Sequence, residues 1–127
     1  MTVSPYEVIV PAGFVWQKPA VIDDWQDGDS AFCHVRIGPD DEQHRVEVRI
    51  EGINAVELRT TFGKEALAAA RGFAPSGTQV MLVEHKREKY GRMLAKMILP
   101  DGSDLGTRML LSVASDGVTP LAVPYLT

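Results

Sequence analysis

The sequence predicts a mainly β fold with helices (α+β), in which five short strands close into a barrel and two helices accompany it. Three observations lead to this fold class. Apolar and polar residues alternate in several short segments, turn dipeptides separate these segments, and two other segments carry helix-forming patterns. A chain of 127 residues is large enough for one core and too short for two domains. We therefore expect one domain over 1–127, with 1–19 as an N-terminal strand extension.

The first half of the chain predicts strands joined by turns, before any helix. Pro11-Ala12-Gly13 ends or bends the first extended segment. Asp27-Gly28 is a two-residue hairpin signal, and a strand with alternating apolar residues returns after it. The acidic run 40–42 is typical of a solvated turn. The expected strands in this half are 6–10, 20–25, 30–37 and 44–53.

The second half predicts a helix, two strands and a second helix. Residues 66–71 are rich in alanine and leucine, and Gly72 with Pro75 closes that helix. Residues 104–113 have apolar side chains at helical spacing. The order of strands and helices is that of the oligonucleotide/oligosaccharide-binding (OB) barrel with a helix at one end. The remaining expected segments are strands at 78–84 and 92–99 and an extended tail over 123–125.

Composition limits the classes of function. The net charge of −4 and the pI near 5.3 argue against a protein that coats nucleic acid by bulk charge. Nucleic-acid binding therefore requires a local basic patch or a bound cation. Cys33 is the single cysteine, so an intrachain disulfide is excluded. We see neither a signal peptide nor a membrane-spanning run, and we expect a cytoplasmic protein without membrane contact.

The segment 48–57 carries the first chemical motif. Val48, Ile50 and Gly52 alternate with Arg49 and Glu51, so the arginine is displayed on the face opposite the core. We expect Gly52 to break the strand and a bend over 53–56 to bring Glu57 back towards Arg49. A guanidinium beside a carboxylate suits phosphodiester chemistry, because one holds phosphate oxygens and the other accepts a proton from water. The alternative interpretation is an ordinary surface ion pair.

The segment 85–92 carries the second motif. Five of its eight residues are potentially cationic in a chain that is acidic overall, which favours a loop that faces phosphate. A solvated hairpin tip is the alternative interpretation. We expect Arg92, at the start of the next strand, to project from the same barrel end as Arg49.

Four segments in order resemble the staphylococcal nuclease-like (thermonuclease) family. Each motif alone is weak, and the combination covers nearly everything from residue 20 onward. The closing segment 120–125 also resembles the end of that family's domain. The segments are Asp27-Gly28-Asp29-Ser30, the run 48–57, Phe62-Gly63-Lys64-Glu65-Ala66, and Lys89-Tyr90-Gly91-Arg92 with Leu94-Ala95.

The resemblance implies a calcium-dependent nuclease that hydrolyses phosphodiester bonds of single-stranded DNA or RNA with little sequence preference. Arg49, Glu57 and Arg92 fall on the family's catalytic residues, with Glu57 as general base or water orienter and the arginines on the phosphate. The implied metal-binding residues are Asp29, Asn54, Ala55 and Glu57. The implied substrate-binding residues are Lys89, Tyr90 and Tyr125.

The chain departs from the family pattern at three places. Asn54 stands where many members carry an aspartate, so calcium binding should weaken or another divalent cation be preferred. Val56 replaces a proline, which should loosen the bend that aims Glu57. The family's C-terminal helix has no counterpart before Thr127, and a homodimer is one way to cover the smaller core.

Three functions remain open at this point. The first is the metal-dependent nuclease. The second is a barrel that binds single-stranded nucleic acid or nucleotides and cleaves them weakly or not at all. The third is an interaction module that uses another surface, since a fold does not fix a function.

Overall fold

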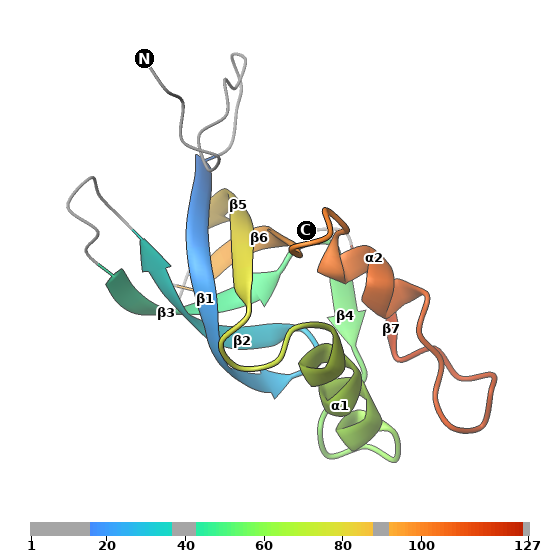
Figure 1. Cartoon of the computed structure of the whole chain (residues 1–127). Coiled ribbons are helices and arrows are strands. Elements are labelled where there is room, and N and C mark those ends of the chain that lie inside the picture. Colours follow the sequence, from blue (N-terminus) through green and yellow to red (C-terminus); the bar gives the residue numbers. More distant parts are fainter. Residues whose placement is uncertain (1–15, 37–42, 88–91, 126–127) are drawn as a thin grey trace.

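The computed structural model describes residues 16–36, 43–87 and 92–125 (Figure 1). The expected strand at 6–10, the acidic turn at 40–42 and the substrate-binding candidates Lys89 and Tyr90 lie outside these ranges. In the described part, the chain forms β1 (Trp16–Asp27), β2 (Ser30–Arg36), β3 (Gln43–Ile50), β4 (Ile53–Ala55), α1 (Gly63–Phe73), β5 (Gln79–Arg87), β6 (Met93–Ile98), α2 (Leu105–Leu110) and β7 (Ala122–Pro124).

Five of these strands close into a barrel in the order β1-β2-β3-β6-β5, and β5 pairs back with β1. Neighbouring strands are antiparallel except β3 and β6, which are parallel. The parallel pair requires the chain to cross over after β3, and α1 and β5 lie in that crossover (Figure 1). The predicted fold class, a mainly β OB-like barrel with two helices, is confirmed.

The first barrel strand begins earlier than the sequence predicts. Trp16 pairs with Glu84 and Lys18 with Leu82, so 16–19 belong to the barrel and not to an extension. Register shifts after Ile22 and after Trp25 mark irregularities in β1. Such bulges bend a strand and increase its twist, which lets one long strand pair with both β2 and β5.

The expected single strand over 44–53 is instead two strands. Gly52 adopts a positive φ of 87°, which a glycine reaches without steric cost, and the chain turns there as expected. The predicted bend at 53–56 is wrong, because Ile53–Ala55 forms β4 and pairs antiparallel with β7. This pairing fixes the C-terminal segment beside the end of β3.

Both helices differ in extent from the expected ranges. α1 begins at Gly63 and continues through Gly72 to Phe73, so Gly72 lies inside the helix and does not close it. α2 covers only Leu105–Leu110, and its N-cap Asp104 accepts a hydrogen bond from the Gly106 backbone N–H at 3.0 Å. Neither helix in the described ranges is long and apolar enough to span a membrane.

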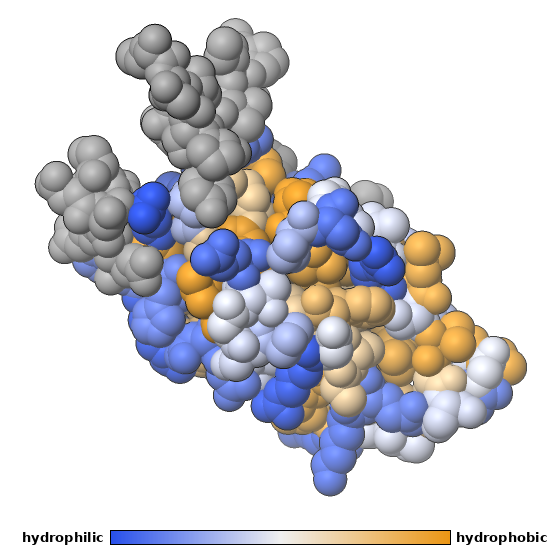
Figure 2. All heavy atoms as spheres, in the orientation of Figure 1, coloured by the Kyte–Doolittle hydropathy of each residue, from blue (hydrophilic) through white to orange (hydrophobic). Residues whose placement is uncertain are grey.

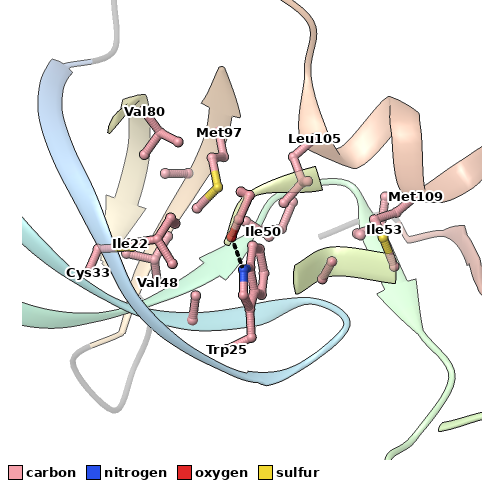
Figure 3. Packing of buried hydrophobic residues seen from close by; sticks show 14 of the residues in the cluster. Ile22, Trp25, Cys33, Val48, Ile50, Ile53, Val80, Met97, Leu105 and Met109 are labelled. Carbon is pink, nitrogen blue, oxygen red and sulfur yellow. Dashed lines mark hydrogen bonds between the residues drawn. The ribbon is translucent and has the colours of Figure 1, made fainter. Parts of the chain in front are cut away.

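The core fills the barrel and continues beneath the helices (Figure 3). Ile22, Val48 and Met97 point into the barrel, whereas Leu105 and Met109 of α2 pack with Ile53 of β4. The Trp25 indole N–H donates a hydrogen bond of 2.8 Å to the Ala74 carbonyl (Figure 3). This bond ties the C-terminal end of α1 to β1, which places α1 at one end of the barrel.

Candidate functional site

The candidate site lies where the β1–β2 hairpin meets the end of β3. Ser30 pairs with Arg49 across β2 and β3, and the Ile50 N–H donates to the Asp29 carbonyl at 2.8 Å. Two of the four sequence motifs, around Asp29 and around Arg49, are therefore adjacent in the fold.

Arg49 is the centre of this site. It lies on the outer face of β3, as expected, but only 8% of its surface is exposed. Its Nη2 donates to Asn54 Oδ1 at 2.6 Å and lies 3.6 Å from Asp29 Oδ2. Its guanidinium carbon lies 5.8 Å from the centroid of the Tyr125 ring. The guanidinium is thus held in one position by an amide, a carboxylate and an aromatic ring.

Asp29 supplies the negative charge. Its Oδ2 accepts a hydrogen bond of 2.8 Å from the Ala55 backbone N–H, and its own N–H donates to Asp27 Oδ1 at 3.0 Å. Burial, together with a hydrogen bond to the Asp27 side chain, raises the pKa of Asp29 from its ordinary value of 3.8 to about 6. The nearby Arg49 acts in the opposite direction. The negative charge of this pair of aspartates is therefore only partly compensated.

Arg92 lies on the same outer face as Arg49. It directly precedes β6, whose Leu94 pairs with Arg49, so the two arginines are about 7 Å apart along the strand direction. Arg92 Nε lies 3.6 Å from Glu47 Oε2, and the side chain is about one third exposed. One side of the barrel therefore carries two guanidinium groups, that of Arg49 buried and that of Arg92 partly exposed.

Glu57 lies in the loop between β4 and α1. Its carbonyl accepts hydrogen bonds from the Thr60 N–H and hydroxyl at 2.9 and 2.6 Å, and this fixes the backbone. Its side chain is 74% exposed, with Oε2 3.8 Å from Arg59 Nε. Among the described contacts, the Glu57 carboxylate meets Arg59 and does not meet Arg49.

Val56 anchors the chain before Glu57 through its backbone. Its backbone N–H donates a hydrogen bond of 2.9 Å to the Leu121 carbonyl. A proline has no N–H and cannot make this bond. The valine therefore fixes the segment by a contact that a proline would lack.

Two glycines of the motifs bring the surrounding elements together. A Cβ at Gly28 would lie 2.7 Å from the Ala55 Cβ and 3.1 Å from that of Ala66, so the hairpin contacts both β4 and α1. A Cβ at Gly63 would lie 2.1 Å from the Glu57 carbonyl oxygen. These positions require glycine because another backbone or side chain occupies the space.

The oxygen atoms around Asp29 are donors of the type that a hard cation binds. The candidates Asp29, Asn54, Ala55 and Glu57, with the neighbouring Asp27, all offer oxygen, the donor that calcium prefers. The raised pKa of Asp29 also favours a bound cation, which would relieve the repulsion between its carboxylate and that of Asp27. No cluster of three or more acidic, histidine or cysteine side chains forms a metal site in the part of the chain described. The donors fit calcium in type, and the small number of carboxylates indicates weak binding.

Asp27 is a site residue that sequence reasoning missed. The Asp27-Gly28 pattern predicts only a turn, but Asp27 ends β1 and Asp29 lies in the two-residue turn that follows, so both carboxylates lie at one hairpin. The resemblance otherwise selected residues that lie together, namely Asp29, Arg49, Asn54, Ala55 and Tyr125.

Searches of protein-family models and of curated proteins with this chain find no match.

Proposed function

We propose that this chain is a metal-dependent phosphodiesterase that hydrolyses DNA or RNA with little sequence preference. The observation that carries the proposal is the buried Arg49 guanidinium, held between Asp29 and Asn54 at the barrel edge. A guanidinium held in place at a partly dry site binds phosphate oxygens strongly, because it needs no reorganisation when the charge of the transition state develops.

The other residues receive roles from their positions and chemistry. Arg92, on the same face, would hold a second phosphate oxygen, and the Tyr125 ring would stack on a base. Glu57, exposed on a fixed backbone, would orient or deprotonate the attacking water. Lys89 and Tyr90 are substrate-binding candidates on the resemblance alone.

A calcium ion would be held by Asp29 and by Asn54, Ala55 and Glu57, with Asp27 as an additional donor. Such a cation, when bound, polarises the phosphate and favours a hydroxide nucleophile. Asn54 accepts a hydrogen bond from Arg49, so its oxygen is shared between the guanidinium and any bound cation. We therefore expect activity only at high calcium concentration.

Arg92→Ala tests the proposal. We expect the wild type to cleave single-stranded DNA in calcium and Arg92→Ala to lose about 100-fold or more in kcat, which is the usual cost of removing a group that stabilises transition-state charge. The control is Arg108→Ala on α2, whose side chain is also partly exposed and paired with an aspartate. Wild-type turnover in Arg92→Ala would remove Arg92 from the mechanism, and a folded wild type that does not cleave would contradict the proposal.

A second function is a barrel that binds single-stranded nucleic acid without cutting it. Two observations favour it: Arg49 engages the Asn54 oxygen, and the Glu57 carboxylate contacts Arg59. Binding of an oligonucleotide in EDTA, without cleavage at any calcium concentration, would identify this second function.

A further inference from the structure

Asn54 joins two elements at the candidate site. It lies in the middle of β4, and its neighbours Ile53 and Ala55 fall on the other face of the strand, where Ile53 is buried in the core. The side chain of Asn54 therefore points to the outer face, where it is exposed to solvent and meets Arg49. β7, which pairs with β4 (Figure 1), leads directly to Tyr125, whose ring lies 5.8 Å from the same guanidinium.

The contact with Arg49 fixes how the Asn54 amide is turned. A guanidinium has only N–H donors, so the atom that faces it must be the amide oxygen. Arg49 Nη2 donates to this oxygen at 2.6 Å, and Arg49 Nη1 donates to the Ile50 carbonyl at 2.7 Å. The Asn54 oxygen is thus engaged by Arg49, and the amide nitrogen with its two N–H groups is turned away from the guanidinium.

This orientation makes Asn54 a better partner for an anion than for a cation. A hard cation binds through oxygen lone pairs, and the Asn54 oxygen already accepts a short hydrogen bond from a positively charged group. The amide N–H groups, in contrast, are hydrogen-bond donors, and phosphate oxygens accept hydrogen bonds from such groups. Arg49 binds oxygens of the same kind. The two adjacent side chains therefore offer N–H donors to one phosphate.

The neutral charge of Asn54 also favours a phosphate. Asp27 and Asp29 already place two carboxylates at the hairpin, and Asp29 Oδ2 lies 3.6 Å from Arg49 Nη2. A third carboxylate, at position 54, would cancel more of the positive charge of Arg49 and repel a phosphate. An amide keeps the contact with Arg49 and adds no negative charge.

We propose that Asn54 is a substrate-binding residue of this site: its oxygen holds Arg49, and its amide nitrogen donates to the phosphate that Arg49 binds. This inference rests on the proposed function and, within it, assigns Asn54 to the phosphate and not to the cation. The asparagine that stands in place of the family's aspartate then changes the role of the position and does not merely weaken a metal site.

The test measures two affinities by isothermal titration calorimetry, that of calcium for the free protein and that of thymidine 5′-phosphate for the protein saturated with calcium. We expect Asn54→Ala to bind calcium as tightly as the wild type and thymidine 5′-phosphate about tenfold more weakly, the usual effect of losing a hydrogen bond to a charged group. Asn54→Asp keeps an acceptor for Arg49 but has no N–H to donate, so its affinity for the nucleotide should also fall. The matched control is Gln79→Ala, which removes an exposed amide at the start of β5 and should equal the wild type in both affinities.

Weaker calcium binding by Asn54→Ala would overturn the inference, because Asn54 would then be a metal ligand. Wild-type affinity of Asn54→Asp for thymidine 5′-phosphate would overturn it too, since holding Arg49 would then be the whole role of the side chain. A wild type that does not bind this nucleotide would have the same consequence.

Cleavage of single-stranded DNA, measured alongside, separates this inference from the proposed function. If both variants bind the nucleotide more weakly and the wild type does not cleave, the role of Asn54 stands and the proposed hydrolysis fails. If the wild type cleaves and Asn54→Ala binds the nucleotide normally, the hydrolysis stands and the role of Asn54 fails.

Discussion

At the residue scale, the titration of Asp29 links the site to stability. Its folded-state pKa of about 6 lies above the ordinary value of 3.8, so the folded protein holds this proton more tightly than the unfolded chain. The corresponding stabilisation is fully present below pH 3.8 and is lost as the pH rises through 6. The ionised form of Asp29 is therefore less stabilising at neutral pH than its protonated form is at low pH.

We expect Asp29→Asn to remove the part of the pH dependence of stability that comes from Asp29. Between pH 4.5 and 7.5 the wild type should lose about 2 kcal/mol of unfolding free energy relative to Asp29→Asn, from a shift of roughly two pKa units. Urea denaturation at both pH values measures the difference. Asp24→Asn, an exposed change on β1, should retain the wild-type dependence. If the unfolding free energies of the wild type and Asp29→Asn change equally with pH, the pKa of Asp29 is not raised in the folded protein.

The residue types of the site were predictable and their contacts were not. The spacing of motifs selected Asp29, Arg49 and Asn54, because their chemistry is local to each short segment. The guanidinium of Arg49 contacts the ring of Tyr125, which lies far away in the sequence. No pattern within one segment contains that information.

At the element scale, the junction between β4 and α1 depends on Gly63. We expect Gly63→Ala to cost at least ~2 kcal/mol of unfolding free energy, because its Cβ would overlap the Glu57 carbonyl and force the backbone apart. Gly72→Ala, in the same helix with no atom within 4 Å of its Cβ, should instead stabilise by about 0.5–1 kcal/mol. Thermal unfolding of the two variants makes the comparison. A Gly63→Ala variant as stable as the wild type would contradict the close approach of the Glu57 carbonyl to position 63.

The pairing of β4 with the C-terminal β7 gives a second element-scale prediction. Val56→Pro restores the residue that the family resemblance would place there, but it removes the N–H that donates to Leu121. We expect a loss of about 1 kcal/mol or more in unfolding free energy, because the Leu121 carbonyl loses its donor. Urea denaturation provides the measurement, and a more stable Val56→Pro variant would show that the rigid ring outweighs the bond.

The elements themselves were predicted to different degrees. The sequence predicts β2 and α1, because the alternation of apolar residues in β2 and the helix-forming residues of α1 each lie within one segment. β4 was missed because three residues carry no readable period and the partner strand lies far along the chain. α2 was predicted too long, since apolar Val113 lies in a bridge to Pro120 and not in the helix.

At the scale of the whole molecule, the order of strands was sufficient to predict the closed barrel. In that barrel β3 pairs with β6 in parallel, and this pairing places Arg49 and Arg92 on the same face. The homodimer stays a prediction. Apolar atoms gather over α2 and the loop that follows (Figure 2), where Leu111, Val113 and Val118 are exposed, and this is the described surface that such a dimer would cover.

If the Arg49 site hydrolyses phosphodiester bonds, as we propose, Glu57 is the residue whose role is most directly measured. The measurement is the cleavage rate of single-stranded DNA across a calcium titration, for the wild type and Glu57→Ala, with EDTA as the zero-metal point. We expect calcium-dependent cleavage that falls at least about 100-fold in Glu57→Ala, while oligonucleotide binding is retained. Equal rates in the two proteins, or no wild-type cleavage at any calcium concentration, would contradict the claim.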